Sequence, residues 1–131
     1  MEFQLNTIGC LLILLALIHI IFPKYFNWKE ELNHLSLINK QIMQVHTFFI
    51  ALTVFLMGIL CVTSANEIIT TSLGKKISLG FGIFWLCRLL IQFFGYSSKL
   101  WKGKAFETTV HITFLIFWLL LSLTFLKIAF S

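Results

Sequence analysis

The stretch Thr108–Leu126, TTVHITFLIFWLLLSLTFL, decides the fold class of this chain. It contains no Asp, Glu, Lys or Arg, and as a helix it would be about 28 Å long, close to the ~30 Å of hydrocarbon in a bilayer. Three further apolar runs precede it, at about 5–22, 45–62 and 77–96. Backbone N–H and C=O groups cannot stay unpaired in lipid, so each run is predicted to form a transmembrane helix.

Composition supports the same conclusion for the whole chain. Apolar and aromatic residues make up 59% of the sequence and charged residues 11%, whereas soluble domains carry about 25% charged residues. The four runs and their connections account for nearly all of residues 1–131. We therefore predict one all-α domain, an integral membrane four-helix up-down bundle, and expect any chemistry to lie in the bundle or its connections.

The connection between the first two runs, residues 23–44, is too long for a tight turn. It starts with Pro23, which is predicted to end the first helix. Asn27 followed by Glu30 resembles a capping box, with Asn in place of Ser or Thr. Three apolar side chains then share one helical face: Trp28, Leu32 and Leu35. The pattern predicts a short interfacial helix at about 28–38, lying in the headgroup layer.

Lysines indicate the orientation in the membrane and the kind of partner. An even number of spans puts both termini on one side, and the opposite side receives six of the nine lysines: Lys24, Lys29, Lys40, Lys99, Lys102 and Lys104. By the positive-inside rule that side is cytoplasmic, so both termini are predicted to be non-cytoplasmic. The lysines occupy short connections and do not form a continuous patch with stacking aromatics, which favours anionic lipid over nucleic acid as the counter-charge. The Phe-, Ile- and Lys-rich usage is typical of an AT-rich bacterial genome, hence of a bacterial inner membrane.

Ionisable side chains recur at similar depth in several spans. His19, His46 and His111 each lie near the predicted cytoplasmic end of a different helix, within the apolar run. Arg88 lies near the middle of the third run, where a charge costs about 2.5–3.5 kcal/mol on insertion scales. Such a residue needs a partner, and intramembrane polar residues nearly always face the protein interior.

Helical spacing extends these residues into polar faces. On the third helix Trp85, Arg88, Gln92 and Tyr96 recur at three- and four-residue intervals, and on the fourth Glu107 lies four residues before His111. We therefore predict an intramembrane site near the cytoplasmic face. Its primary candidate ligands are His46, His111, His19 and Glu107. Its secondary candidates are Glu31, His34, Arg88, Gln92 and Tyr96.

Several chemistries fit this set of residues. Imidazoles and carboxylates bind zinc, iron or copper. The same imidazoles suit the axial positions of a b-type haem, with Arg88 or lysines facing its propionates. Proton or anion handling is a third possibility, because histidine titrates near neutral pH. Purely structural roles compete with all three: Arg88 snorkelling or pairing with Glu107, and Gly80 and Gly82 permitting close helix approach.

The leading functional hypothesis is a membrane protein that holds a metal ion or haem for redox chemistry, metal handling or complex assembly. The alternative is a cofactor-free accessory subunit that binds partner helices, a second copy or lipid. A membrane metalloenzyme acting on a lipid-soluble substrate is the third. The sequence contains no phosphate-binding glycine loop, His-Glu-x-x-His motif or serine nucleophile elbow, and none of the inverted repeats typical of transporters.

Overall fold

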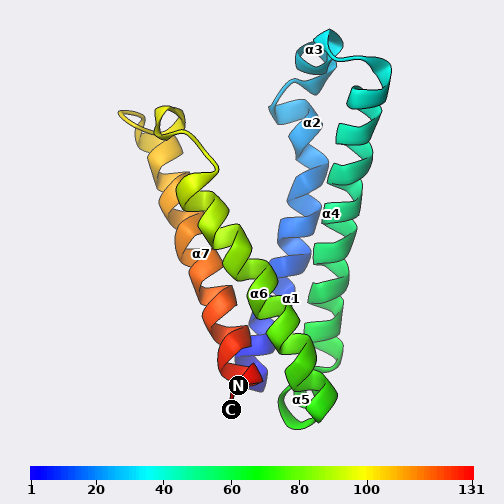
Figure 1. The fold of residues 1–131 in the computed structure, drawn as a ribbon, viewed down its shortest axis with the longest axis vertical. Helices are drawn as coiled ribbons and strands as arrows, with labels where there is room; N and C mark the ends of the chain where they lie inside the picture. Colours follow the sequence, from blue (N-terminus) through cyan, green and yellow to red (C-terminus); the bar gives the residue numbers. More distant parts are fainter. The chain divides into compact units, whose positions relative to one another are not determined.

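The computed structural model covers residues 1–131, which form two compact helical units, 1–65 and 66–131 (Figure 1). The chain contains helices and no strands, as predicted. Four helices are long and apolar enough to cross a membrane: Glu2–Tyr25, Leu37–Thr63, Ser72–Phe94 and Ala105–Ala129. The all-α class and the four apolar helices are therefore confirmed, while their assembly into one up-down bundle stays a prediction.

The first unit is a hairpin of α1 (Glu2–Ile18) and α4 (Leu37–Thr63). Their backbones approach closely at two glycines. A Cβ added to Gly9 would lie 2.8 Å from the carbonyl oxygen of Gly58, and one added to Gly58 would lie 2.7 Å from that of Gly9. A carbonyl oxygen cannot rotate away as a side chain can, so this contact requires glycine on both helices.

Pro23 tightens the first span instead of ending it. A 3₁₀ turn, His19–Ile21, follows α1, and α2 (Phe22–Tyr25) then completes the apolar span. Because Pro23 has no N–H, it cannot donate to the carbonyl of His19. The N–H of Phe22 bonds to that carbonyl in its place, which is the 3₁₀ pattern.

The connection that follows is shorter and less regular than the predicted interfacial helix. It consists of α3 (Trp28–Glu31) and a 3₁₀ turn (Leu32–His34). Asn27 precedes α3 in the left-handed region (φ 55°), and its side chain donates to Glu30 Oε2 at 3.0 Å rather than capping the backbone. Ser36 then caps α4, so the helical path breaks at extended Leu35. A position in the headgroup layer stays a prediction.

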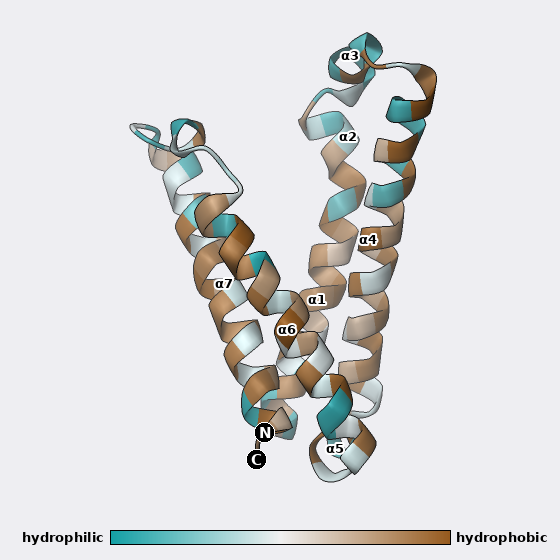
Figure 2. Cartoon of the chain, in the orientation of Figure 1, coloured by the Kyte–Doolittle hydropathy of each residue, from teal (hydrophilic) through white to brown (hydrophobic).

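The second unit is a hairpin of α6 (Ser72–Phe94) and α7 (Ala105–Ala129), preceded by the short α5 (Ala65–Thr70). A 3₁₀ turn, Ser98–Leu100, lies in the α6–α7 connection. A Cβ on Gly82 would lie 2.7 Å from Leu126 Cδ2, which confirms a close approach there, whereas Gly80 has nothing within 4 Å and does not serve that role. Figure 2 shows hydrophobic residues along the long helices and hydrophilic ones gathered in the connections.

Candidate functional site

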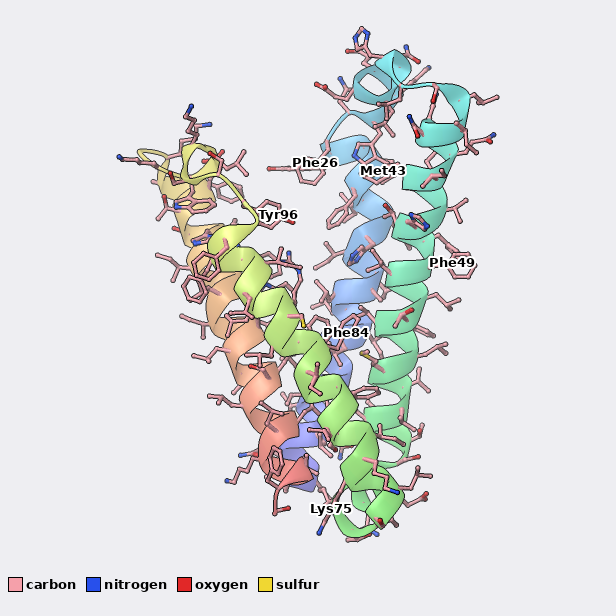
Figure 3. The ribbon with its side chains drawn as sticks, viewed as in Figure 1. Phe26, Met43, Phe49, Lys75, Phe84 and Tyr96 are labelled. Atoms are coloured by element: carbon pink, nitrogen blue, oxygen red, sulfur yellow. The ribbon has the colours of Figure 1, made fainter.

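Arg88 lies at the centre of a polar network in the second hairpin. Its Nη1 donates to Gln92 Oε1 at 3.2 Å and its Nη2 to the Tyr96 hydroxyl at 3.5 Å. The guanidinium carbon lies 4.9 Å from the Trp118 ring centroid and 5.5 Å from that of Tyr96, within the range of cation–π attraction. Its partners lie four residues later on α6 and eight residues later in the α6–α7 connection, where Figure 3 labels Tyr96, so the side chain points toward that connection.

Gln92 joins α6 to α7 through both ends of its amide. Its Oε1 also accepts from Trp118 Nε1 at 3.2 Å, and its Nε2 lies 2.8 Å from His111 Nδ1. Arginine and tryptophan N–H groups can only donate, so the oxygen must face Arg88 and Trp118 and the NH₂ must face His111. Gln92 is 7% exposed. The amide is therefore a buried link between two helices.

This arrangement fixes the state of the His111 ring. Because the Gln92 NH₂ donates, His111 Nδ1 accepts and the hydrogen of the neutral ring is on Nε2. The ring stacks on Trp101, with centroids 3.8 Å apart and planes at 10°. Neither ring nitrogen then offers a lone pair to a metal ion unless the hydrogen bond to Gln92 opens.

Aromatic rings lie on the other side of the network. Trp85 stacks on Trp118 with centroids 5.2 Å apart and planes at 8°, and Phe114 stacks on Trp118 at 5.4 Å. The two tryptophans therefore pack α6 against α7. Sequence reasoning missed the second role of Trp118, its hydrogen bond to Gln92. The signal available was its position seven residues after His111, on the same face of α7.

Most of the hydrogen-bonding capacity left over in and beside the network belongs to donors. Arg88 has five N–H bonds and uses two. Trp85 Nε1 is buried with no partner. His111 Nε2–H and the hydroxyl hydrogen of Tyr96 also remain after the bonds described above. A cation surrounded by surplus donors favours a ligand that supplies negative oxygen acceptors.

No carboxylate balances the charge of Arg88 from within its own hairpin. Both of its hydrogen-bond acceptors are neutral. Pairing with Glu107 was one of two structural alternatives for Arg88, but Glu107 lies exposed in the first turn of α7 and is not among the partners of Arg88. The acidic residues of the chain all lie in short helices or first turns: Glu2, Glu30, Glu31, Glu67 and Glu107.

The other candidates belong to the first hairpin. His19 Nδ1 lies 2.8 Å from the Leu15 carbonyl oxygen, which can only accept, so Nε2 keeps its lone pair. His46 is exposed on α4, and Glu31 and His34 are exposed in the α3 connection. The chain contains no group of three or more His, Cys, Asp or Glu side chains placed to hold a metal ion. A site combining His19, His46 and His111 stays a prediction.

The structure thus brings together Arg88, Gln92, Tyr96 and His111 from the predicted set. Comparison with protein-family models, curated proteins and solved structures finds no match. The function is therefore argued from the chemistry of these residues.

Proposed function

We propose that this integral membrane protein binds an anionic, oxygen-bearing ligand within the bilayer, at the Arg88 network formed by Arg88, Gln92, Tyr96, His111 and Trp118. The observation that carries the proposal is the guanidinium of Arg88, whose hydrogen-bond acceptors are both neutral. A charge at this depth is costly unless it is paired, at about 2.5–3.5 kcal/mol. An anionic ligand removes that cost.

The geometry of the donors favours a carboxylate or a phosphate. Arginine presents its N–H groups in a planar fork that matches two oxygens of such a group, and charge-assisted bonds of this kind are about twice as strong as neutral ones. Gln92 and Trp118 hold the guanidinium in place, because the Gln92 oxygen bonds to both. The network is thus preorganised, and a ligand need not order it on binding.

The proposal corresponds to the cofactor-free binding role among the sequence hypotheses. Anion binding uses the His111 ring as the structure presents it, with a donor at Nε2. Metal or haem ligation by His111 would first require the Gln92 bond to break. The state of this ring therefore favours an anion over a metal at the Arg88 network.

Native mass spectrometry of gently extracted protein tests the proposal. We expect the wild-type chain to retain one anionic molecule, and Arg88→Gln to lose it. Gln92→Glu is the sharper variant, because it places a carboxylate beside Arg88 and should displace the ligand while the hairpin still folds. Lys76→Gln removes one positive charge from the other end of α6 and serves as the matched control. Retention of the same molecule by Arg88→Gln would refute the proposal.

A metal or haem site is the second candidate, and His19 is the observation that favours it. Donation from Nδ1 to the Leu15 carbonyl orients the ring and leaves Nε2 free, the usual arrangement of a metal-ligating histidine. His46, His111 and Glu107 are the further ligands in this hypothesis. Absorbance in the Soret region and elemental analysis of wild type and His19→Ala test it. Wild-type protein without stoichiometric metal or haem would eliminate it.

A further inference from the structure

We infer that the anion at the Arg88 network is the headgroup phosphate of an anionic phospholipid, held jointly by Arg88 and a lysine collar. The lysine collar is defined as Lys99, Lys102 and Lys104, the three lysines of the α6–α7 connection. The inference rests on the proposed function and adds the source of the anion. Three steps support it: the charge of the collar, its attachment to the network, and the direction of the Arg88 side chain.

The collar is a concentrated positive charge at one end of the hairpin. All three of its lysines are exposed. The one carboxylate close to them in sequence is Glu107, three residues after Lys104. Clusters of lysine directly outside a transmembrane helix attract anionic phospholipid, each residue strengthening binding about fivefold near the surface. The collar therefore matches a phosphate at the membrane interface.

The connection that carries the collar is attached to the Arg88 network. The Thr108 hydroxyl donates to the Trp101 carbonyl at 2.6 Å, and the Trp101 ring stacks on His111. His111 in turn bonds to Gln92, the acceptor of Arg88. The connection that carries the collar is thus joined to the network by a continuous set of contacts, which places collar and network at the same end of the hairpin.

Arg88 itself points toward the collar. Long side chains on a helix usually lean toward its N-terminus, but the guanidinium of Arg88 contacts Gln92 and Tyr96, which lie toward the C-terminus. This is the direction of snorkelling toward the nearer headgroup layer. A phospholipid has phosphate oxygens at the interface and ester carbonyl oxygens just below, so a single molecule supplies acceptors to the collar and to the deeper donors of Arg88.

The opposite end of the same hairpin differs from the collar end. It also has three lysines, Lys75, Lys76 and Lys127, but Lys75 Nζ donates to the backbone oxygen of Ser131 at 2.9 Å. No arginine points toward that end, since Arg88 is the chain's sole arginine. A carboxylate on a partner helix, the competing source of an anion, would need Arg88 alone and leave the collar without a role.

Lipid titration compares the two ends directly. Phosphatidylglycerol is added to the full chain in neutral detergent, and bound lipid is counted by native mass spectrometry, with phosphatidylcholine, whose zwitterionic headgroup has no net charge, as the reference. The variant K99Q/K102Q/K104Q should bind phosphatidylglycerol about 100-fold more weakly than wild type at low salt. The matched control K75Q/K76Q/K127Q loses the same charge and should bind like wild type. Added salt should weaken wild-type binding, because it screens the exposed collar.

The outcomes separate this inference from the proposed function. If the collar variant binds phosphatidylglycerol like wild type while Arg88→Gln does not, the lysines play no part and the joint site is refuted, but anion binding at Arg88 stands. If Arg88→Gln binds like wild type, the proposed function itself fails. Equal wild-type affinity for phosphatidylcholine and phosphatidylglycerol would overturn the inference as well, since the site would not select for charge.

Discussion

Replacing Gln92 by Leu should lower the stability of the second hairpin without changing its net charge. Leucine is similar in size to glutamine but cannot form the three hydrogen bonds that Gln92 makes to Arg88, Trp118 and His111. Two of these cross between helices, and such bonds in membranes are worth about 0.6 kcal/mol on average and ~1.7 kcal/mol at most. Trp118, 4% exposed, would also keep a buried N–H without an acceptor, at about 1–3 kcal/mol. With two bonds of average strength and the unpaired N–H, we expect a total loss of about 2–4 kcal/mol in the free energy of unfolding.

Unfolding in mixed micelles with increasing SDS, followed by circular dichroism, measures this change. Trp fluorescence provides a second signal, because the indole of Trp118 loses its hydrogen bond in the variant. Gln44→Leu is the matched control, since Gln44 is an exposed glutamine on α4 whose side chain makes no hydrogen bond. A loss below about 0.5 kcal/mol in Gln92→Leu, less than one average membrane hydrogen bond, would refute the reasoning.

Three further predictions concern the helix contacts and the orientation. Gly58→Leu should separate α1 from α4, because its Cβ would meet the Gly9 carbonyl oxygen at 2.7 Å. SDS unfolding should show that the free energy of unfolding falls by about 1–3 kcal/mol or more, and unchanged stability would contradict the close approach. Gly82→Leu should likewise destabilise the second hairpin while Gly80→Leu, with open space around it, should not, and equal losses would contradict the contact at Gly82. Alkaline phosphatase fused to the C-terminus should be active in a bacterial host, since the lysine distribution predicts a non-cytoplasmic C-terminus; an active fluorescent-protein fusion with inactive phosphatase would reverse the orientation.

The four apolar helices could be predicted from the sequence because lipid imposes one requirement, a fully hydrogen-bonded apolar segment. Helix ends were less predictable. Helix α4 begins at Leu37, well before the predicted span at Val45, because hydropathy marks only the part of a helix that lies in lipid and not its extension into a polar segment. Pro23 was expected to end a helix, but a 3₁₀ turn accommodates its missing N–H.

The candidate site could also be predicted only in part. Residues on one face of the predicted third helix, such as Arg88, Gln92 and Tyr96, were predictable from spacing alone, although α6 ends at Phe94 and Tyr96 lies just beyond it. Contacts between helices depend on how α7 is rotated about its axis, which spacing does not determine. The hydrogen bond from Trp118 to Gln92 was missed for that reason. Of the two structural roles considered for Arg88, pairing with Glu107 is not seen, and Glu107 lies in the first turn of α7, where the helix dipole stabilises its charge without a cation.

A solid-state NMR measurement of dipolar coupling between the Arg88 guanidinium and lipid phosphorus tests the central claim most directly. Arginine labelled with ¹³C at Cζ reports on one site, because the chain has a single arginine. In bilayers containing phosphatidylglycerol, the account predicts dephasing of the Cζ signal by ³¹P, as expected for a phosphate hydrogen-bonded to the guanidinium, and its loss in Gln92→Glu. A Cζ signal unaffected by ³¹P would contradict the claim that a phospholipid phosphate balances this charge.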